Sequence, residues 1–257
     1  MNRYPWFRRL TACLAVGLLL AAVPAPAPAQ TGPPDAEAPS TSCPTPFSDV
    51  PHSSPYYVSV ECLACDGEIQ GYNDGTFRPN APLTRSQLAK IVALGLRLTT
   101  PPPPEQQDFA DVPLTHPFWT WIERLITLPG APGYICGRAD DPCAPPSQPR
   151  YFLPSKLLTR SETAEFLRAV LQGTCPGPTW RQSFADVTPS RGDWCTVEWA
   201  ASAGVISGYP CGGPGEPCGS PALPYFRPDV LMTRGQAAVA AVRAFQLFGL
   251  DRCPILP

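Results

Sequence analysis

The sequence predicts a mainly α-helical fold, in which three helix–loop–helix repeats pack into one trilobed body with loops clipped by disulfides. Three observations support this fold: a short motif that occurs three times, a helix-start signal that follows each copy, and eleven cysteines, ten of which follow a predicted leader peptide. Two short helices cannot enclose an apolar face alone, so we expect the three units to bury their core against one another.

The leader comes first along the chain, at residues 1–29. Three arginines precede an uncharged apolar stretch from Leu10 to Val23, and a small-residue site, Ala27-Pro28-Ala29, follows it, as in a secretory signal peptide. The apolar stretch is shorter than the roughly 20 residues that span a bilayer. Residues 30–43 then form a Pro/Ser/Thr-rich linker. We expect an exported protein without a transmembrane segment.

Each repeat opens with a motif that has phenylalanine, aspartate and valine at fixed positions. Its copies are Phe47-Ser48-Asp49-Val50-Pro51, Phe109-Ala110-Asp111-Val112-Pro113 and Phe184-Ala185-Asp186-Val187-Thr188. The three aspartates are interpreted as turn formers rather than as sugar ligands. A glutamate and a Gly-Tyr pair follow every copy at matching spacing: Glu61, Glu123 and Glu198, then Tyr72, Tyr134 and Tyr209.

Repeat one is expected over residues 44–100. Apolar residues at amphipathic-helix spacing mark its first helix: Tyr57, Val60, Leu63 and Ala64. The loop that follows is compact and turns at Asp74-Gly75. The second helix follows Thr84 and is expected to bury three aliphatic side chains: Leu88, Ile91 and Val92.

Repeats two and three are expected over residues 105–172 and 173–250, after a polyproline spacer at residues 101–104. The first helix of repeat two has a clear amphipathic pattern: Phe118, Trp119, Ile122, Leu125 and Ile126. Trp119 and its counterpart Trp194 are expected in the core. Both repeats lengthen the loop with a segment between two cysteines, which is why their loops depart from that of repeat one.

The second helix of every repeat starts with the same signal. The three copies are Leu83-Thr84-Arg85-Ser86-Gln87, Leu158-Thr159-Arg160-Ser161-Glu162 and Met232-Thr233-Arg234-Gly235-Gln236. Thr-x-x-Glu/Gln is a capping box, so Thr84, Thr159 and Thr233 are expected to be N-caps. Capping does not explain the arginines, because a cation in the first turn opposes the helix dipole. Their recurrence favours a carboxylate partner, either on a ligand or across a boundary between lobes.

The ten cysteines after the leader predict five disulfides in an exported chain. Two pairs lie at equivalent places after a Gly-Tyr pair and should clip their own loops: Cys136–Cys143 and Cys211–Cys218. The remaining expected pairs are Cys175–Cys195, Cys43–Cys62 and Cys65–Cys253. No metal site and no cofactor are expected, because the Cys62–Cys65 spacing has no second cysteine pair or histidine cluster to complete four zinc ligands.

These motifs resemble the S-layer homology (SLH) domain, which normally occurs in threes in exported bacterial proteins. The resemblance covers residues 44–250 and is most specific in repeat one, where all three family elements occur in order. Repeats two and three depart from the family in their loops, and Gln87 and Gln236 stand where the family usually has glutamate.

The resemblance implies a pseudo-threefold assembly around a central bundle of three helices, with grooves between the lobes that bind cell-wall glycan non-covalently. The glycan would be a secondary cell-wall polymer, typically pyruvylated, or a peptidoglycan-linked carbohydrate. Arg85, Arg160 and Arg234 match the groove arginine of the family, and a guanidinium can hold a ketal carboxylate with two parallel hydrogen bonds. Asp74 and Gly75 would form a binding edge beside Arg85. We expect these arginines at the surface, contributing little to folding, with Arg85 contributing most to binding.

Two function classes fit these expectations. One is a secreted anchor that binds glycan at the cell wall or cell surface; the other is a structural envelope or S-layer assembly protein whose grooves bind other proteins. Catalysis is not expected, because His52 and His116 lie at different repeat positions and form no visible catalytic arrangement. Nucleic acid is not expected as a partner, because the formal net charge is −2 and no Lys/Arg-rich run occurs. The third repeat ends close to Pro257, so any anchored effector should be a separate partner.

Overall fold

The computed structural model describes residues 47–103, 105–130, 133–135, 150–175, 177, 181–247 and 249. By its internal contacts the chain divides into Met1–Ser42 and Cys43–Pro257, and all described residues belong to the second unit. The predicted signal peptide and linker lie outside the described residues.

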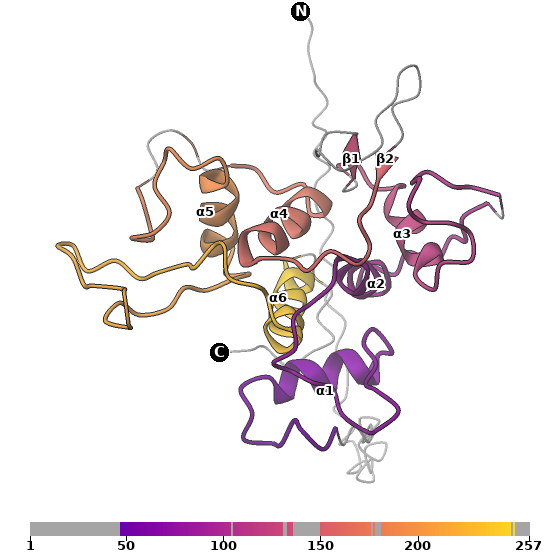
Figure 1. The fold of residues 1–257 in the computed structure, drawn as a ribbon, viewed down its shortest axis with the longest axis horizontal. Coiled ribbons are helices and arrows are strands. Elements are labelled where there is room, and N and C mark those ends of the chain that lie inside the picture. The colour runs from indigo at the N-terminus through magenta and orange to yellow at the C-terminus, as the bar shows by residue number, and fades with distance from the viewer. Residues whose placement is uncertain are drawn as a thin grey trace, which may run out of the picture. The chain divides into compact units, whose positions relative to one another are not determined.

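The described residues form six α-helices and one short β-hairpin (Figure 1). In chain order these are α1 (Tyr57–Cys65), α2 (Arg85–Gly95), α3 (Trp119–Leu125), β1 (Tyr134–Ile135), β2 (Arg150–Tyr151), α4 (Arg160–Val170), α5 (Trp194–Ser202) and α6 (Arg234–Gln246). Each predicted repeat supplies one pair of helices: α1 with α2, α3 with α4, and α5 with α6. The prediction of a mainly helical fold is confirmed.

The second helix of every pair begins at a complete capping box. The Thr84 hydroxyl accepts a hydrogen bond from the backbone amide of Gln87, whose side chain accepts one from the backbone amide of Thr84. The same reciprocal bonds join Thr159 to Glu162 and Thr233 to Gln236. A side-chain N-cap of this kind stabilises a helix by about 1 kcal/mol. The three threonines therefore fix where α2, α4 and α6 start.

The helix-start segments join the three repeats into a closed ring. The backbone amide of Leu83 donates to Met232, that of Met232 to Leu158, and that of Leu158 back to Leu83, at 2.9, 2.8 and 3.0 Å. The first amide of each following helix also donates to the next repeat: Arg85 to Lys156, Arg160 to Val230 and Arg234 to Ala81. These bonds satisfy N-terminal donors that have no partner inside a helix.

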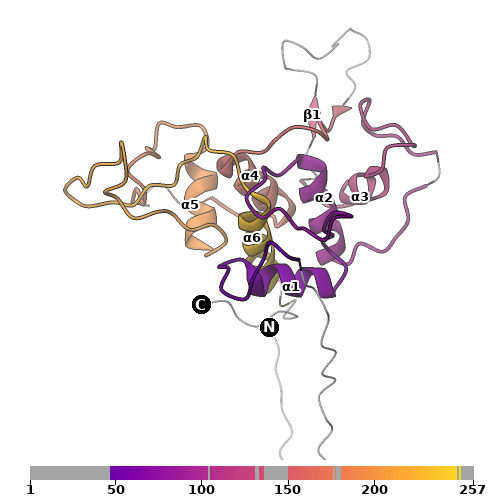
Figure 2. The same ribbon diagram turned by 60° about the horizontal axis from the view of Figure 1, so that its bottom comes forward.

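Helices from different repeats pack as pairs. α2 packs on α3, α4 packs on α5, and α6 packs on α1. The second helix of each repeat thus covers the first helix of the next, and repeat three closes onto repeat one. Within Cys43–Pro257, Figures 1 and 2 both show α2, α4 and α6 near the centre, with α1, α3 and α5 outside them. Among the described helices, the main packing partner of each first helix is therefore the second helix of a different repeat.

The core is one continuous cluster along these helices. Leu88 and Val92 are fully buried and Ile91 nearly so, which confirms the face predicted for α2. α6 contributes buried alanines to this core. The ring of Phe245 on α6 packs directly against Gly95 on α2, so that a Cβ atom at Gly95 would overlap the ring. Trp119 and Trp194 are partly buried and pack against the core.

The three motif aspartates fix the loops of their own repeats. Asp49 accepts hydrogen bonds from the backbone amides of Phe77 and Arg78 at 2.8 and 2.7 Å. Asp111 holds Phe152 and Leu153 in the same way, and Asp186 holds Phe226 and Arg227. The second residue of each pair has a φ of 59°, a left-handed conformation that costs an L-residue roughly 1–2 kcal/mol. The interpretation of these aspartates as structural residues is confirmed.

Two disulfides lie within the described residues, and both join cysteines that were expected to pair. They are Cys175–Cys195, with Cα atoms 5.2 Å apart, and Cys211–Cys218, with Cα atoms 5.1 Å apart. Cys62 and Cys65 are also disulfide-bonded. Their expected partners, Cys43 and Cys253, and the expected pair Cys136–Cys143 lie outside the described residues.

The sequence analysis did not anticipate the hairpin of repeat two. β1 pairs antiparallel with β2, so that Tyr134 lies opposite Tyr151. Repeat three has a single antiparallel bridge at the same place, between Tyr209 and Tyr225. Both pairings close the base of a lengthened loop. Two residues per strand are too few to produce a recognisable alternating pattern.

Candidate functional site

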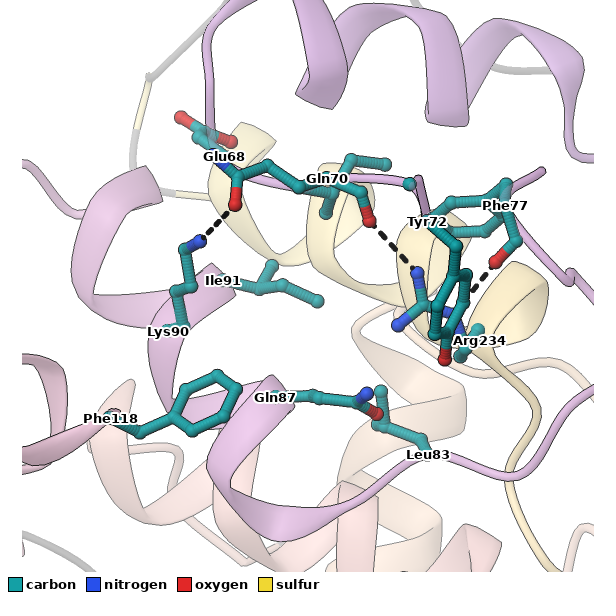
Figure 3. A pocket seen from close by; sticks show the side chains of 12 residues that line it. Glu68, Gln70, Tyr72, Phe77, Leu83, Gln87, Lys90, Ile91, Phe118 and Arg234 are labelled. Carbon is teal, nitrogen blue, oxygen red and sulfur yellow. Dashed lines mark hydrogen bonds between the residues drawn. The ribbon is translucent and has the colours of Figure 1, made fainter. Parts of the chain in front are cut away.

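Two clefts lie at equivalent places beside α2 and α6. The α2 groove has a volume of about 190 Å³, and its polar lining includes Gln70, Tyr72, Gln87, Lys90 and Arg234 (Figure 3). The α6 groove has a volume of about 320 Å³, and its polar lining includes Arg160, Ser207, Tyr209, Gln236 and Arg243. Both grooves combine the Gly-Tyr loop and second helix of one repeat with the helix-start arginine of the preceding repeat in the ring.

The helix-start arginines are buried, so the expectation that they lie at the surface is wrong. Arg85, Arg160 and Arg234 are only 5%, 3% and 8% exposed. The guanidinium of Arg160 donates from Nε to the carbonyl of Phe226 and from Nη2 to that of Ser207, both at 2.7 Å. These bonds tie the start of α4 to the loop of the next repeat. The reason for the burial is the ring itself, which carries each helix start underneath a neighbouring loop.

Arg234 makes the equivalent contacts across the boundary between repeats three and one. Its Nε donates to the carbonyl of Phe77 at 2.9 Å and its Nη2 to that of Gln70 at 3.1 Å (Figure 3). Arg234 therefore forms one wall of the α2 groove although it belongs to α6. One side of its guanidinium is occupied by structural bonds.

The sequence analysis expected Arg85 beside Asp74-Gly75, but Arg85 lies beside the loop of repeat two. Its Nη1 donates to the hydroxyl of Tyr134 at 3.1 Å, and its guanidinium lies 4.7 Å from the centroid of that ring. The correction follows from the cyclic order of the repeats, because each helix start crosses to the next repeat. The Asp74-Gly75 loop faces Arg234 instead.

Asp74 and Gly75 shape the loop of repeat one but do not line the α2 groove. Asp74 accepts hydrogen bonds from the amide and hydroxyl of Thr76 and pairs with Arg78 at 2.9 Å. These bonds lower the pKa of the Asp74 carboxyl to about 2. Gly75 has a φ of 77°, which glycine adopts without steric cost. Both residues therefore shape the loop without contacting the groove itself.

Each Gly-Tyr pair places a tyrosine ring against two cations. Tyr72 has Arg78 at 3.8 Å and Arg234 at 5.2 Å from its centroid, and Tyr209 has Arg227 at 3.9 Å and Arg160 at 4.8 Å. In repeat two, Leu153 replaces the first of these arginines, and Lys156 lies 5.6 Å from the Tyr134 centroid beside Arg85. Contacts of this kind restrict the position of an aromatic ring and contribute about 0.5–1 kcal/mol at exposed sites.

The loops, helix starts and groove tyrosines of repeats one and three lie within two matches to a family model. The S-layer homology domain model matches residues 46–89 and 183–238. The chain carries S-layer homology domains. The matches include Arg85, Arg234 and the Gly-Tyr pairs at Tyr72 and Tyr209. No curated protein matches the chain.

SLH domains are binding or anchoring modules that typically attach to cell-wall polymers, which implies association with the cell surface. The middle helix pair, α3 and α4, lies entirely between the two SLH matches. It shares with the matched segments the capping box at Thr159, the loop-holding Asp111 and the contact between a helix-start arginine and Tyr134. In the described part of the chain, no helix is long and apolar enough to cross a membrane.

The two grooves of the SLH protein differ in charge. The α2 groove has Lys90 and Arg234 but also Glu68, and Lys90 donates to the side chain of Gln70 at 2.9 Å (Figure 3). Burial lowers the pKa of the Lys90 ammonium. The α6 groove has Arg160 and Arg243 and no acidic side chain among the described residues that line it. The α6 groove is therefore the more cationic of the two.

Arg243 and Lys90 are groove residues that the sequence analysis missed. Lys90 follows the capping residue Gln87 by three positions, and Arg243 follows Gln236 by seven, so each lies on the same helix face as its capping residue. Arg243 donates from Nη1 to the hydroxyl of Ser207 at 3.1 Å. Helical spacing from the capping box is the signal that would have identified both, and the SLH motif itself ends before Arg243.

Proposed function

We propose that this protein is exported and binds a cell-wall carbohydrate non-covalently through its SLH grooves. The observation that carries the proposal is the α6 groove, where Arg160, Arg243 and the ring of Tyr209 line one cleft. A sugar ring can stack on an aromatic face, and guanidinium groups bind carboxylates through charge-assisted hydrogen bonds. This combination suits a saccharide with an acidic substituent, such as the pyruvyl ketal of a secondary cell-wall polymer.

Arg160 and Arg243 would have different roles in this groove. Two N–H groups of Arg160 already bond backbone carbonyls, so Arg160 mainly fixes the loop and supplies charge. Arg243 is less buried and lies further along α6, where it can reach a ligand carboxylate. We further propose that residues 44–100, 105–172 and 173–250 are three SLH repeats of one ring, and that residues 1–29 are removed on export.

Sedimentation with cell walls tests this function. The mature protein should sediment with walls isolated from the producing bacterium and be released by denaturant without covalent cleavage. Chemical removal of the secondary polymer should abolish sedimentation. Arg243→Ala should lower the bound fraction several-fold, whereas Arg181→Ala, an exposed arginine that lines neither groove, should bind as the wild type does. Equal recovery on an unrelated insoluble polysaccharide would contradict specific anchoring.

A structural role in envelope assembly is the second candidate, and the burial of the three arginines favours it. Arginines that serve as ties between repeats need no sugar to explain their recurrence. In that case the grooves would bind segments of other envelope proteins, and sedimentation would depend on a proteinaceous layer. Walls stripped of protein but not of polymer distinguish the two candidates, because only glycan binding survives that treatment.

A further inference from the structure

The loop clipped by Cys211–Cys218 presents a carboxylate that holds an arginine behind the α6 groove. Glu216 accepts hydrogen bonds from Nε and Nη2 of Arg227 at 2.7 and 2.8 Å. The two side chains are 14% and 35% exposed. A two-pronged, half-buried pair is more restricted in geometry than a single exposed ion pair. Glu216 therefore determines where the Arg227 guanidinium lies.

The clipped loop is itself held at its base, its middle and its tip. Tyr209 and Tyr225 exchange backbone hydrogen bonds at the base, at 2.7 and 2.8 Å. The disulfide closes the middle. At the tip the amide of Gly212 donates to the carbonyl of Glu216 at 2.7 Å. Glu216 is thus positioned by covalent and hydrogen-bonded closure of the segment that carries it.

Arg227 in turn contacts Tyr209, which lines the α6 groove. Its guanidinium lies 3.9 Å from the ring centroid of Tyr209. Tyr209 lines the α6 groove and accepts a hydrogen bond at its hydroxyl from the side chain of Gln236 at 2.7 Å. Arg227 and Glu216 do not line that groove and belong to a separate surface cleft. They contact the tyrosine from outside the binding cavity.

Repeat one reaches the same arrangement with a different loop sequence. Asp74 pairs with Arg78 at 2.9 Å, and Arg78 lies 3.8 Å from the centroid of Tyr72, which lines the α2 groove. Asp74 precedes Arg78 by four residues in a compact turn, whereas Glu216 comes from an inserted loop eleven residues before Arg227. Two loops of different sequence thus place a carboxylate, an arginine and a tyrosine in the same order beside equivalent grooves.

We propose that the Cys211–Cys218 loop is a positioning element of the α6 groove. The disulfide fixes Glu216, Glu216 holds Arg227, and Arg227 supports the ring of Tyr209, so the affinity of this groove for its saccharide depends on that chain of contacts. The proposal rests on the proposed function, because it concerns the same groove. Glu216 and Arg227 are positioning residues, since they act through Tyr209.

The test compares wall binding by full-length mature variants, with walls isolated from the producing bacterium as the probe. Glu216→Gln and the double variant Cys211→Ser/Cys218→Ser should each raise the apparent Kd about two- to fivefold, the size of one lost cation–π support. Combined, they should weaken binding no more than the stronger of the two, because residues in one chain of contacts are not additive.

A spectroscopic readout separates positioning from general stability. Seven of the eight tyrosines follow the leader, and selective ¹³C labelling of the mature protein should show the Tyr209 ring signals shifting in Glu216→Gln while those of Tyr72 stay in place. The matched control is Cys175→Ser/Cys195→Ser, which removes the other described disulfide and should lower Tm without changing affinity or the Tyr209 signals.

The outcomes distinguish this proposal from the proposed function. If the wild type does not bind walls, both fail together. If the wild type binds and Arg243→Ala weakens binding, but Glu216→Gln and the cysteine variant bind normally, the positioning role is wrong and the anchoring function stands. Additive losses in the combined variant would likewise overturn the chain of contacts.

Discussion

At the scale of single residues, the helix-start arginines have a structural role that their motif does not reveal. A buried guanidinium is tolerated only where its donors are satisfied, and backbone carbonyls of the next repeat accept from Arg160 and Arg234. Removing such a side chain leaves the carbonyl of a buried phenylalanine, Phe226 or Phe77, without its partner. A substitution of one of these arginines should therefore lower stability as well as binding, whereas a substitution of a surface arginine could lower binding alone.

Arg160→Ala should destabilise the protein by about 2–4 kcal/mol, because two charge-assisted hydrogen bonds are lost and the carbonyl of the buried Phe226 is left without a partner. Arg160→Lys should recover only part of this loss, since an ammonium cannot reproduce two parallel donors. Urea denaturation followed by tryptophan fluorescence measures both. Arg181→Ala, at an exposed position, is the control and should lie within about 0.5 kcal/mol of the wild type. An unchanged midpoint for Arg160→Ala would refute the structural role.

A buried glutamate on α3 should make stability depend on pH. Glu123 is 1% exposed, and burial together with the neighbouring Asp108 carboxyl raises its pKa from 4.5 to about 7. Because the folded-state pKa is raised, the stabilising contribution is complete below about pH 4.5 and is lost as the pH rises through 7. The nearby Arg150 opposes this shift but does not cancel it.

Glu123→Gln should remove the loss of stability above pH 7. The variant keeps an acceptor for the backbone amide of Asp108, which lies 3.2 Å from Oε1 of Glu123. The variant should gain Tm relative to the wild type at pH 8 and show no gain at pH 4. Thermal unfolding followed by circular dichroism between these pH values measures the difference. Parallel pH profiles for the two proteins would show that Glu123 does not titrate in this range.

At the scale of elements, the contact between α2 and α6 depends on the absence of a side chain. Glycine inside a helix normally costs about 1 kcal/mol relative to alanine. At Gly95 this cost is offset by the ring of Phe245, which occupies the space of a Cβ atom and is itself only 5% exposed. The last turn of α2 can approach α6 closely for that reason.

Gly95→Ala should therefore destabilise the protein, against the helix propensity of alanine. Overpacking of this kind costs about 1–3 kcal/mol, and urea denaturation should show a lower midpoint. Gly192→Ala is the matched control, because nothing lies within 4 Å of a Cβ atom there. Combining Gly95→Ala with Phe245→Leu should recover part of the loss; if it does not, the clash is not the cause.

The sequence predicts elements better than it predicts their partners. Helix starts and N-caps follow from local chemistry, because a capping box joins residues three positions apart. The loops held by the motif aspartates do not, because each aspartate bonds backbone amides 28 to 42 residues further along the chain. The partner of Arg85 does not follow, since a repeat shows which residues are equivalent and not which copy meets which. Burial of the arginines and the groove roles of Lys90 and Arg243 also depend on packing between repeats, which leaves no local pattern.

At the scale of the whole ring, the first and last repeats depend on each other. α1 packs on α6, and Arg234 bonds the carbonyls of Gln70 and Phe77 in the loop of repeat one. An open array of repeats can lose its ends step by step. A closed ring cannot lose one repeat without exposing the core faces of both neighbours.

Unfolding of the mature protein should therefore be a single cooperative transition. Fluorescence of the five tryptophans that follow the leader and far-UV circular dichroism should give coincident urea curves. A chain ending at residue 172, which lacks repeat three, should fail to fold its first repeat as well, because α1 would lose α6. A stable, cooperatively folded fragment of residues 30–172 would show that the ring is not the folding unit.

The assembly of each groove from two neighbouring repeats has a consequence for how such a protein can arise. A single repeat contains no complete site, because its arginine serves one neighbour and its Gly-Tyr loop accepts the arginine of the other. An ancestral chain with one repeat would have needed a symmetric trimer to form the same clefts, and every substitution would then have altered three sites at once. Duplication within one chain removes that restriction, so one cleft can gain Arg243 while another keeps Lys90 and Glu68.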